Sequence, residues 1–231
     1  MPLNQYQQEV GPSLADARPG KMPDITLLDG RYCSVEHLTV AEHYEDILDF
    51  YFTNRILSDW TYMYADPFGS EEAVRQCLED YEQSSNPYFF AIRDKASGKV
   101  LGTFSLMAIT PKNRSVEMGR VILAPALQKT RAATEAQYLV MTYVFDVLNY
   151  RRYEWKCDSL NRPSANAAQR LGFTYEGRFR NHAIYKGRSR DTDWFSIIDS
   201  EWPALKERFE NWLAPDNFDE NGQQKRSLKE C

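Results

Sequence analysis

The sequence predicts a mixed α/β fold of about seven strands and five helices in one domain. Three features lead to this prediction. The first half holds a meander of short strand-like segments, residues 115–147 pass from a strand into a helical apolar stripe, and two further strands and a helix follow near the end. A chain of 231 residues suits one sizeable domain, conceivably two, and no internal repeat is visible.

Composition and charge are those of an ordinary soluble protein. With a formal net charge of −5, we do not expect direct binding to nucleic acid, although a local basic patch could still contribute to binding. The cysteines have neither C-x-x-C nor zinc-ligand spacing, so we expect reduced thiols and no metal. The N-terminus lacks the apolar core of a signal peptide, and no stretch approaches the roughly 18 apolar residues of a spanning helix. We therefore expect a cytoplasmic protein without a membrane contact.

The first half carries two helices and then the meander of strands. Residues 1–24 mix Gln, Gly, Pro and charged residues without periodicity and predict a mobile tail. Ser70 followed by two glutamates is typical of a helix start, and Ser97-Gly98 is typical of a hairpin loop. We expect strands at 32–38, 88–93 and 100–108, helices at 39–53 and 70–83, and an irregular aromatic segment at 54–69.

Residues 115–149 are the segment around which the chain is organised. Ser115–Leu123 alternates as a strand, and Pro125 then blocks further strand pairing. Thr130 stands where a helix cap is expected, before a helical apolar stripe. The first amides of a helix lack intrahelical partners and the helix dipole adds positive potential, so Gln128–Thr134 predicts a phosphate site. An ordinary strand–helix joint is the alternative.

The second half adds three strands and two helices. The turn at residues 161–164 starts a helix that ends at Leu171, and Gly172 suits its left-handed C-terminal cap. Residues 214–231 are polar and predict a frayed tail after a domain at 25–213. We expect strands at 152–158, 173–179 and 192–198, the last two joined by a basic loop, and a final helix at 202–213.

Several short motifs, taken in order, resemble the GNAT N-acetyltransferase superfamily. They are the central strand, the turn at 128–136, the strand YEWKCD, and the run N-x-x-S…A-A-x-x-L-G-F-x-x-E-G that begins at Asn161. Each motif alone is weak, whereas their order and spacing are specific. The match is most similar to the branch typified by the ribosomal-protein N-terminal acetyltransferases RimJ and RimL, and it covers residues 25–213.

This resemblance implies a GNAT-like domain with a mixed, mostly antiparallel twisted sheet. It also implies acetyl-CoA-dependent transfer to a primary amine, and a separation of the central strand from the YEWKCD strand that admits the pantetheine arm. The predicted contacts of the coenzyme are Val121, Ile122, Leu123, Gln128, Lys129, Thr130, Arg131, Ala132, Ala133, Thr134, Asn161 and Ser164.

The phosphate turn departs from the family pattern Q/R-x-x-G-x-G/A at one position. The chain keeps Gln128 and Ala133 but has Arg131 at the position of the first Gly. Arg131 needs ordinary helical dihedral angles, so the turn could already be helical there. Its guanidinium could contact a phosphate in a bidentate manner, or it could be a solvated side chain on the first turn.

The proton donor is a second departure. Many family members have a Tyr four residues before the Gly of the L-G-F motif, but this chain has Ala168 there. Ser164 lies one turn earlier on the same helix face, and RimL-like relatives are similar in placing a Ser there. The resemblance makes Ser164 the candidate proton donor to the departing thiolate. It also implies that the Asn161 side chain holds the pantetheine amide. The alternatives are a first-turn hydrogen bond for Ser164 and a helix cap for Asn161.

Acyl transfer also needs a base for the amine and an N–H donor for the oxyanion. In the family the strand beside the separation supplies the donor, and Val121–Leu123 match those positions. Strand alternation predicts Glu117, Gly119 and Val121 on one face, so Glu117 is the candidate base, acting through water. A solvent-facing or Arg-paired glutamate is the alternative. We expect Glu135 to serve the helix cap or dipole.

Two further groups have both a functional and a structural interpretation. The aromatic residues Trp60, Tyr62, Tyr64 and Phe68 match the acceptor side by resemblance, but they could equally be core. The basic loop Arg178–Arg190 could attract an acidic substrate or an RNA-bearing partner, or be a solvated hairpin. Nothing in the sequence places His182, in this loop, near the thioester.

The sequence thus predicts a cytoplasmic N-acetyltransferase that uses acetyl-CoA and no metal. The acceptor is the α-amine of a protein or a small-molecule amine, because acceptor pockets in this fold are built from loops. A non-catalytic acyl-CoA-binding regulator of the same fold is the alternative. We expect a monomer or a homodimer.

Overall fold

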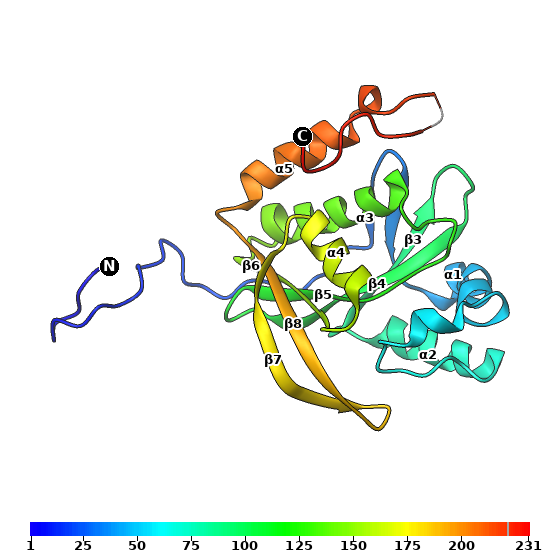
Figure 1. Ribbon diagram of the computed structural model, residues 1–231, viewed down its shortest axis with the longest axis horizontal. Coiled ribbons are helices and arrows are strands. Elements are labelled where there is room, and N and C mark those ends of the chain that lie inside the picture. Colours follow the sequence, from blue (N-terminus) through cyan, green and yellow to red (C-terminus); the bar gives the residue numbers. More distant parts are fainter. Residues whose placement is uncertain (221) are drawn as a thin grey trace.

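One eight-stranded sheet carries the site, with the strand order β1-β2-β3-β4-β5-β6-β8-β7 (Figure 1). The computed structural model describes residues 1–220 and 222–231. Neighbouring strands are antiparallel except for β5 and β6, which are parallel. The predicted α/β fold is confirmed, and β1 is a strand that the sequence did not predict. The strands are β1 (Leu27–Asp29), β2 (Cys33–His37), β3 (Tyr88–Asp94), β4 (Val100–Thr110), β5 (Ser115–Leu123), β6 (Arg152–Asp158), β7 (Thr174–Tyr185) and β8 (Arg188–Ile198).

Helices cover both faces of the sheet and enclose two hydrophobic cores. Strand alternation divides β4 between them: Phe104 and Leu106 belong to the core under α3, whereas Thr103 bonds Tyr51 in the core under α1 and α2. Figure 1 shows α3 and α5 above the sheet and α2 below it. The helices are α1 (Val40–Leu48), α2 (Glu71–Gln83), α3 (Arg131–Thr142), α4 (Arg162–Arg170) and α5 (Trp202–Leu213); a π-helical turn extends α1 to Thr53 and another extends α3 to Val147.

Two predicted helix starts are confirmed by their caps. The side chain of Ser70 accepts a hydrogen bond from the amide of Ala73 at 3.2 Å, and that of Thr130 accepts one from Ala133 at 3.1 Å. These bonds satisfy amides that the first helical turn leaves without a partner. The cap at Thr130 fixes where α3 begins, directly after the end of β5.

Glu135 has a different role from the predicted one. Its buried carboxylate accepts hydrogen bonds from three successive amides, those of Arg31, Tyr32 and Cys33, at 2.8, 2.6 and 2.9 Å. A β-carbon on Gly30 would lie 2.6 Å from this carboxylate, so the turn between β1 and β2 requires glycine there. Glu135 therefore ties α3 to the edge of the sheet rather than acting on the cap of its own helix.

The predicted basic loop is mostly strand. β7 and β8 continue to Tyr185 and Arg188 and form a long hairpin that projects from the body (Figure 1). Lys186 and Gly187 form its two-residue turn with φ angles of 49° and 68°, the left-handed pair that suits the twist of a hairpin. Polar side chains on both strands concealed the strand pattern, because the outer part of the hairpin has no core to face.

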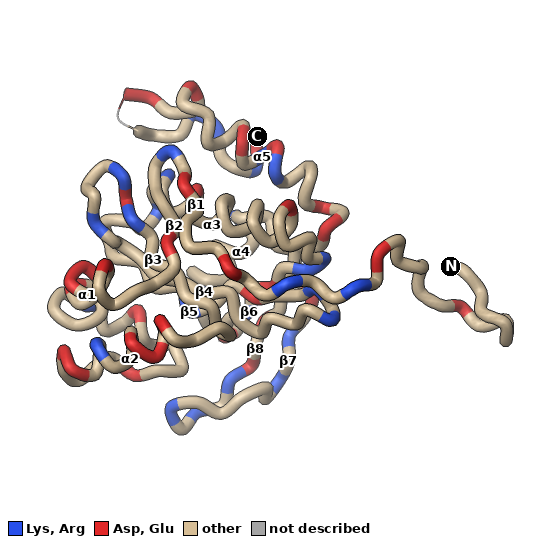
Figure 2. The backbone as a smooth tube through the Cα atoms, turned by 180° about the vertical axis from the view of Figure 1, so that it is seen from behind, with Lys and Arg blue, Asp and Glu red and all other residues tan. Residues whose placement is uncertain are grey.

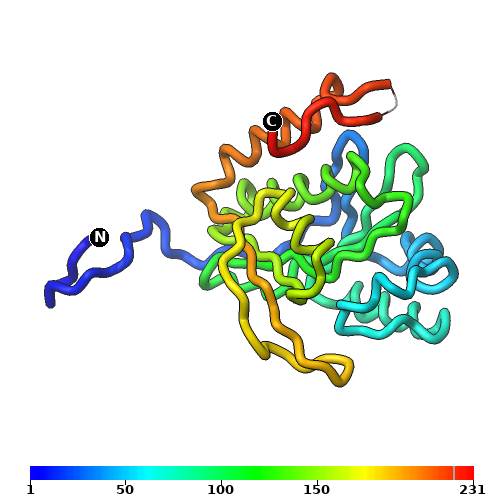
Figure 3. The backbone as a smooth tube through the Cα atoms, viewed as in Figure 1, coloured from blue at the N-terminus to red at the C-terminus, as the bar shows by residue number. Residues whose placement is uncertain are grey.

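The C-terminal tail packs on the body, whereas the sequence predicted fraying. Phe218 and Leu228 are buried, and Trp212 Nε1 donates a hydrogen bond to Gln224 Oε1 at 2.9 Å. Figure 3 shows the tail running back beside α5, and the first residues of the chain extending away from the domain. Two apolar side chains among polar neighbours are enough to hold the tail, and they give no periodic signal in the sequence.

Two further features of the chain concern its thiols and its helices. Cys33, Cys77, Cys157 and Cys231 are all free. Within residues 1–220 and 222–231, every helix is too short or too polar to cross a bilayer.

Candidate active site

The two parallel strands at the centre of the sheet separate. β5 and β6 pair from Ser115 opposite Arg152 to Met118 opposite Trp155, and no pairing follows although both strands continue. Beyond Met118, the backbone groups of β5 on this side have no strand partner. The separation that the family resemblance implied is therefore present, and it opens a gap in the sheet with unpaired backbone donors along one edge.

A β-bulge next to this gap changes which side chains share a face. Gly119 pairs with Ser105 and Ile122 with Thr103, so two residues of β5 stand opposite one of β4, and Arg120 has a φ of 51°. The prediction that Val121 shares a face with Glu117 is therefore wrong, because the extra residue reverses the alternation. Val121 and Leu123 pack toward α3, and Ile122 packs toward α1 and α2.

Ser164 lies on the α3 and α4 side of the gap. Trp155 Nε1 donates a hydrogen bond to Ser164 Oγ at 3.0 Å, and this bond does not use the hydroxyl proton of Ser164. Asn161 Oδ1 accepts a hydrogen bond from the Ser164 amide at 3.2 Å and so caps α4. The capping alternative for Asn161 is thus present, and its Nδ2 group is not used by the cap.

Cys157 is the thiol nearest to this serine on the same side. Burial raises the pKa of Cys157 to about 11, with Ser164 lowering it only in part. At neutral pH the side chain is a protonated thiol and a poor nucleophile. We therefore do not assign Cys157 a role as a nucleophile.

Glu117 lies on the opposite face of the sheet and is paired with a lysine. Its Oε2 lies 2.7 Å from Lys156 Nζ, which also contacts Glu154 at 2.9 Å. Burial raises the pKa of Glu117, and Lys156 opposes this shift. Lys156 also lies over the ring of Trp194, 4.0 Å from its centroid. Glu117 is thus a buried carboxylate of raised basicity beside the gap, and it is neither solvent-facing nor Arg-paired.

The turn before α3 offers free amides. The amides of Lys129, Arg131 and Ala132 make no hydrogen bond with any residue that the structure describes. Lys129 has a φ of 62°, which brings the chain sharply into the helix, and Gln128 Nε2 is committed to the carbonyl of Leu123 at 3.0 Å. Free amides at a helix N-terminus are suited to phosphate oxygens, so this turn fits the diphosphate of a coenzyme.

Arg131, at the start of α3, packs against two aromatic rings. Its guanidinium lies between the rings of Tyr32 and Phe218, with Cζ 4.6 and 4.3 Å from the two centroids. Neither alternative for Arg131, a phosphate contact or a solvated side chain, included these rings, and the phosphate contact stays a prediction. The reason is the folded C-terminal tail, which brings Phe218 to the start of α3.

Arg170 is a second arginine near this turn. It ends α4, and its Nη1 donates a hydrogen bond to Thr134 Oγ1 at 3.1 Å, in the first turns of α3. No carboxylate of the described residues lies within 4.0 Å of it, and burial lowers its pKa from the usual arginine value. A half-buried arginine that lacks an acidic partner among the described residues, beside free helix amides, is suited to an anion.

Residues 54–69 and the β7–β8 hairpin meet above the Glu117 face. Lys186 Nζ donates to the carbonyl of Trp60 at 2.7 Å, and the rings of Tyr64 and Tyr185 lie 5.5 Å apart. Trp60 and Phe68 pack on Tyr51 as core, whereas Tyr64 is 61% exposed. Trp60 and Phe68 of this segment thus belong to the core, whereas Tyr64 lies in the part that covers the Glu117 face.

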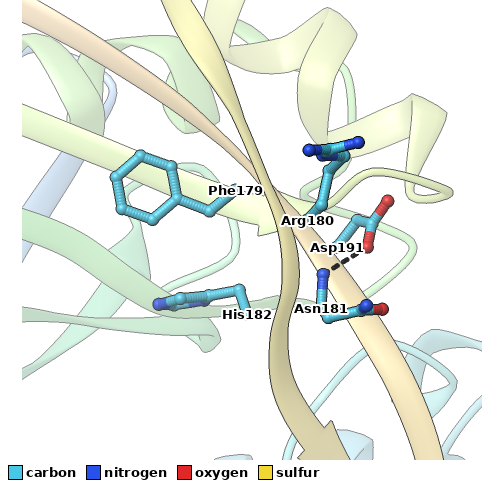
Figure 4. Close-up of a pocket in the computed structure, with 5 residues that line it drawn as sticks. All are labelled: Phe179, Arg180, Asn181, His182 and Asp191. Carbon is cyan, nitrogen blue, oxygen red and sulfur yellow. Dashed lines mark hydrogen bonds between the residues drawn. The ribbon is translucent and has the colours of Figure 1, made fainter.

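The open hollow on the hairpin lies at its outer edge (Figure 4). β7 bulges between Phe179 and Ala183, and Figure 4 shows Phe179 and His182 on one side of the strand and Arg180 and Asn181 on the other. His182 Nδ1 lies 3.0 Å from Thr192 Oγ1. Asp191, the carboxylate in the lining of this hollow, accepts a hydrogen bond from the amide of Asn181 and is not paired with a basic side chain of the described residues. We therefore do not assign the hollow to acyl transfer.

The comparisons with known proteins agree with this geometry. A family model described as acetyltransferase (GNAT) domain matches residues 37–174. The chain belongs to the GNAT acetyltransferase family. The crystal structure of a GCN5-related N-acetyltransferase from Brucella melitensis is 45% identical, with a TM-score of 0.91, and the match covers 94% of this chain and 98% of that one.

Two curated relatives are similar over a shorter stretch. The uncharacterized N-acetyltransferase p20 of Bacillus licheniformis is 30% identical over 144 residues, which is 61% of this chain and 80% of that protein. The spermidine N(1)-acetyltransferase of Escherichia coli K12 is 23% identical over 143 residues, 62% of this chain and 75% of that protein. Both matches cover less than two thirds of this chain.

Lys156 and Arg170 lie beside the candidate site, and the sequence did not single them out. Lys156 stands in the YEWKCD motif next to the gap, and its strand position could have paired it with Glu117. Arg170 gave no signal, because a missing acidic partner is visible only once the neighbours are placed, and Arg190 stood out only as one member of the basic loop Arg178–Arg190. Arg190 is considered below.

Proposed function

We propose that this GNAT protein is an acetyl-CoA-dependent N-acetyltransferase that acts on a primary amine. One observation carries the proposal: Ser164 and Glu117 lie on opposite faces of the sheet, beside the gap between β5 and β6. A thioester held in this gap meets an acid on one side and a base on the other. This is the arrangement that transfer from sulfur to nitrogen needs.

Acetyl-CoA, when bound, supplies the activated acetyl group. The amides of Lys129, Arg131 and Ala132 are suited to its phosphates because they make no hydrogen bond with the described residues, and the guanidinium of Arg170 is suited to them because it has no carboxylate partner among those residues. Val121, Leu123 and Asn161 lie on the side from which the pantetheine arm would approach the gap. Ile122, on the other face, is suited to the acceptor side.

The chain's own residues move the protons. Glu117 Oε1 or Oε2 takes a proton from the attacking amine through water, and its raised pKa favours this. Lys156 orients the carboxylate. Ser164 Oγ gives its proton to the departing sulfur while Trp155 Nε1 holds the oxygen in place. Unpaired β5 amides beyond Met118 stabilise the developing oxyanion.

The acceptor class and the setting are part of the proposal. The N-x-x-S…A-A-x-x-L-G-F run and the serine donor favour the RimJ/RimL-like branch, which acts on protein N-termini. A small-molecule amine is the other acceptor class, and one relative is named a spermidine acetyltransferase. We place the protein in the cytoplasm, as a monomer or homodimer.

Two measurements test this function. Calorimetry with acetyl-CoA and with CoA should show binding, and thiol release should accelerate with some member of a panel of alkylamines, amino acids, polyamines and N-terminal peptides. Binding without thiol release over the whole panel would contradict the enzyme and favour a regulator that binds acyl-CoA. Absence of both would contradict coenzyme binding itself.

A further inference from the structure

Arg190 is a buried arginine with few partners. It is 7% exposed, and its Nε donates one hydrogen bond, to Thr192 Oγ1 at 3.0 Å. No carboxylate among the described residues lies within 4.0 Å of its guanidinium, so four of its five N–H groups make no hydrogen bond with the described chain. Two other basic residues of the hairpin have acidic partners: Arg178 pairs with Asp193, and Lys186 pairs with Asp66.

The two rings beside Arg190 come from the two segments that cover the Glu117 face. Its Cζ lies 4.9 Å from the centroid of Tyr64, in the 54–69 segment, and 5.6 Å from that of Tyr185, in the hairpin. These contacts stabilise the charge partly, because the ring faces are weakly negative. They also leave the N–H groups of Nη1 and Nη2 without a hydrogen-bond partner among the described residues.

The nearest carboxylates serve other groups. Asp158 accepts a hydrogen bond from Tyr185 Oη at 2.7 Å and one from the amide of Leu160 at 2.8 Å. Glu117 is paired with Lys156. Removing a charge from water without an ionic partner is costly, so a guanidinium in this position favours an anion that arrives from outside the chain.

We propose that Arg190 binds an anionic group of the acceptor, so that the substrate is a primary amine that also carries a carboxylate or a phosphate. The inference rests on the proposed function. A guanidinium fork matches either anion in a bidentate manner. Figure 2 shows other basic residues along this hairpin, which would attract such a substrate toward Arg190. A polyamine, which carries only positive charge, would be the wrong partner.

The strand register suggests how far the two groups of the acceptor lie apart. Trp194, beside Lys156, and Arg190 are four residues apart on β8, and four residues of extended strand span about 13 Å. The long side chain of Arg190 covers part of this distance. The acceptor amine and its anion are therefore separated by several bonds, as in an ω-amino acid or an acidic peptide, rather than by one carbon.

A matched series of amines tests this inference. The series holds butylamine, 4-aminobutyrate, 6-aminohexanoate, 3-aminopropyl phosphate and spermidine, and kcat/KM is measured by thiol release. Wild-type protein should prefer the anionic members over butylamine. Arg190→Gln should reduce this preference ratio about 10- to 100-fold, as expected for a lost charge-assisted hydrogen bond. Arg188→Gln, which removes an exposed arginine of the same strand, should leave the ratio within about twofold.

A further variant and a binding measurement distinguish failure of this inference from failure of the proposed function. Arg190→Lys should restore part of the ratio, and melting temperatures will show that the variants fold. Calorimetry with each anionic amine, on protein saturated with CoA, gives a readout that does not need turnover. Binding that depends on Arg190 without turnover would contradict the proposed function but support the inference. If Arg190→Gln turns over or binds the amines with an unchanged preference for the anionic members over butylamine, the inference is overturned. A preference for the phosphate over the carboxylates identifies the anion.

Discussion

Single side chains on the two faces of the β5–β6 gap carry the proposed chemistry. Ser164 and Glu117 come from different elements and make no contact with each other. Each instead has its own supporting residue, Trp155 for the serine and Lys156 for the glutamate. This separation allows the two proton transfers to be tested one at a time.

Replacing Ser164 with alanine should lower kcat and leave the affinity for acetyl-CoA nearly unchanged. The hydroxyl matters mainly when the thiolate departs. Because a thiol has a pKa of roughly 8.5, the thiolate leaves fairly well without help, so the loss should be at or below roughly a hundredfold. Thiol release and calorimetry measure the two quantities. Wild-type turnover in the variant, where chemistry limits the rate, would assign the proton to water or to another group.

Replacing Glu117 with glutamine should lower the rate most at low pH. Burial raises the pKa of the Glu117 carboxyl and thus makes it a better base, which the amide cannot replace. The loss should shrink as pH rises, because more of the amine is already neutral. This recovery comes near pH 8 for an α-amine and above pH 10 for a lysine-type amine, as their pKa values of roughly 8 and 10.4 require.

Glu154→Gln is the matched control for this profile. It removes the other carboxylate of Lys156 and leaves the Glu117–Lys156 pair intact. A wild-type pH–rate profile in Glu117→Gln, or an equal change in both variants, would make Glu117 a structural residue.

At the scale of elements, the ends of α3 and α4 form the proposed coenzyme site. Thr130 caps α3 by a local hydrogen bond that the sequence predicts, whereas the approach of Arg170 to Thr134 depends on how two helices pack. The bulge at Arg120 is likewise a matter of pairing with β4, and it decides which side chains of β5 face the coenzyme.

Replacing Arg170 with glutamine should weaken binding of acetyl-CoA by roughly tenfold or more. One charge-assisted hydrogen bond to a phosphate is worth about that much. Arg162→Gln removes the same charge from the exposed first turn of α4 and is the control. Calorimetry at fixed salt compares them with the wild-type protein. Equal affinities for all three proteins would place the phosphates away from Arg170.

At the scale of the molecule, the C-terminal tail is part of the folded domain. Leu228 is 1% exposed and belongs to the main core, and Phe218 covers the Arg131 guanidinium. The tail therefore reaches the start of α3 from the end of the sequence and fills the place where Arg131 would otherwise meet solvent.

Replacing Leu228 with alanine should lower the free energy of unfolding by about 2–5 kcal/mol, as for other buried leucines. Leu160→Ala is the control, since Leu160 is 70% exposed and its loss should cost less than about 0.5 kcal/mol. Denaturant titration of both variants measures the difference. A free energy in Leu228→Ala equal to that of the wild-type protein would show that the tail is frayed in solution.

The sequence by itself determined the kinds of elements, their order and the family. Periodicity, caps and glycine turns act within a few residues, so Ser70, Thr130 and the motif run from Asn161 could be interpreted without the fold. The short strand β1 and the outer hairpin were missed because their residues face little or no core.

Only the tertiary structure decided the partners of the charged residues. Glu117 lies beside Lys156, Arg131 between two rings, and Arg190 next to no carboxylate among the described residues, although each was an ordinary charged residue in the sequence. Such pairings join segments tens of residues apart and follow from strand register and from the β5–β6 gap. The physical reason is that a charge is stabilised by whatever the whole fold brings within a few ångströms of it, and neighbours along the chain do not determine that.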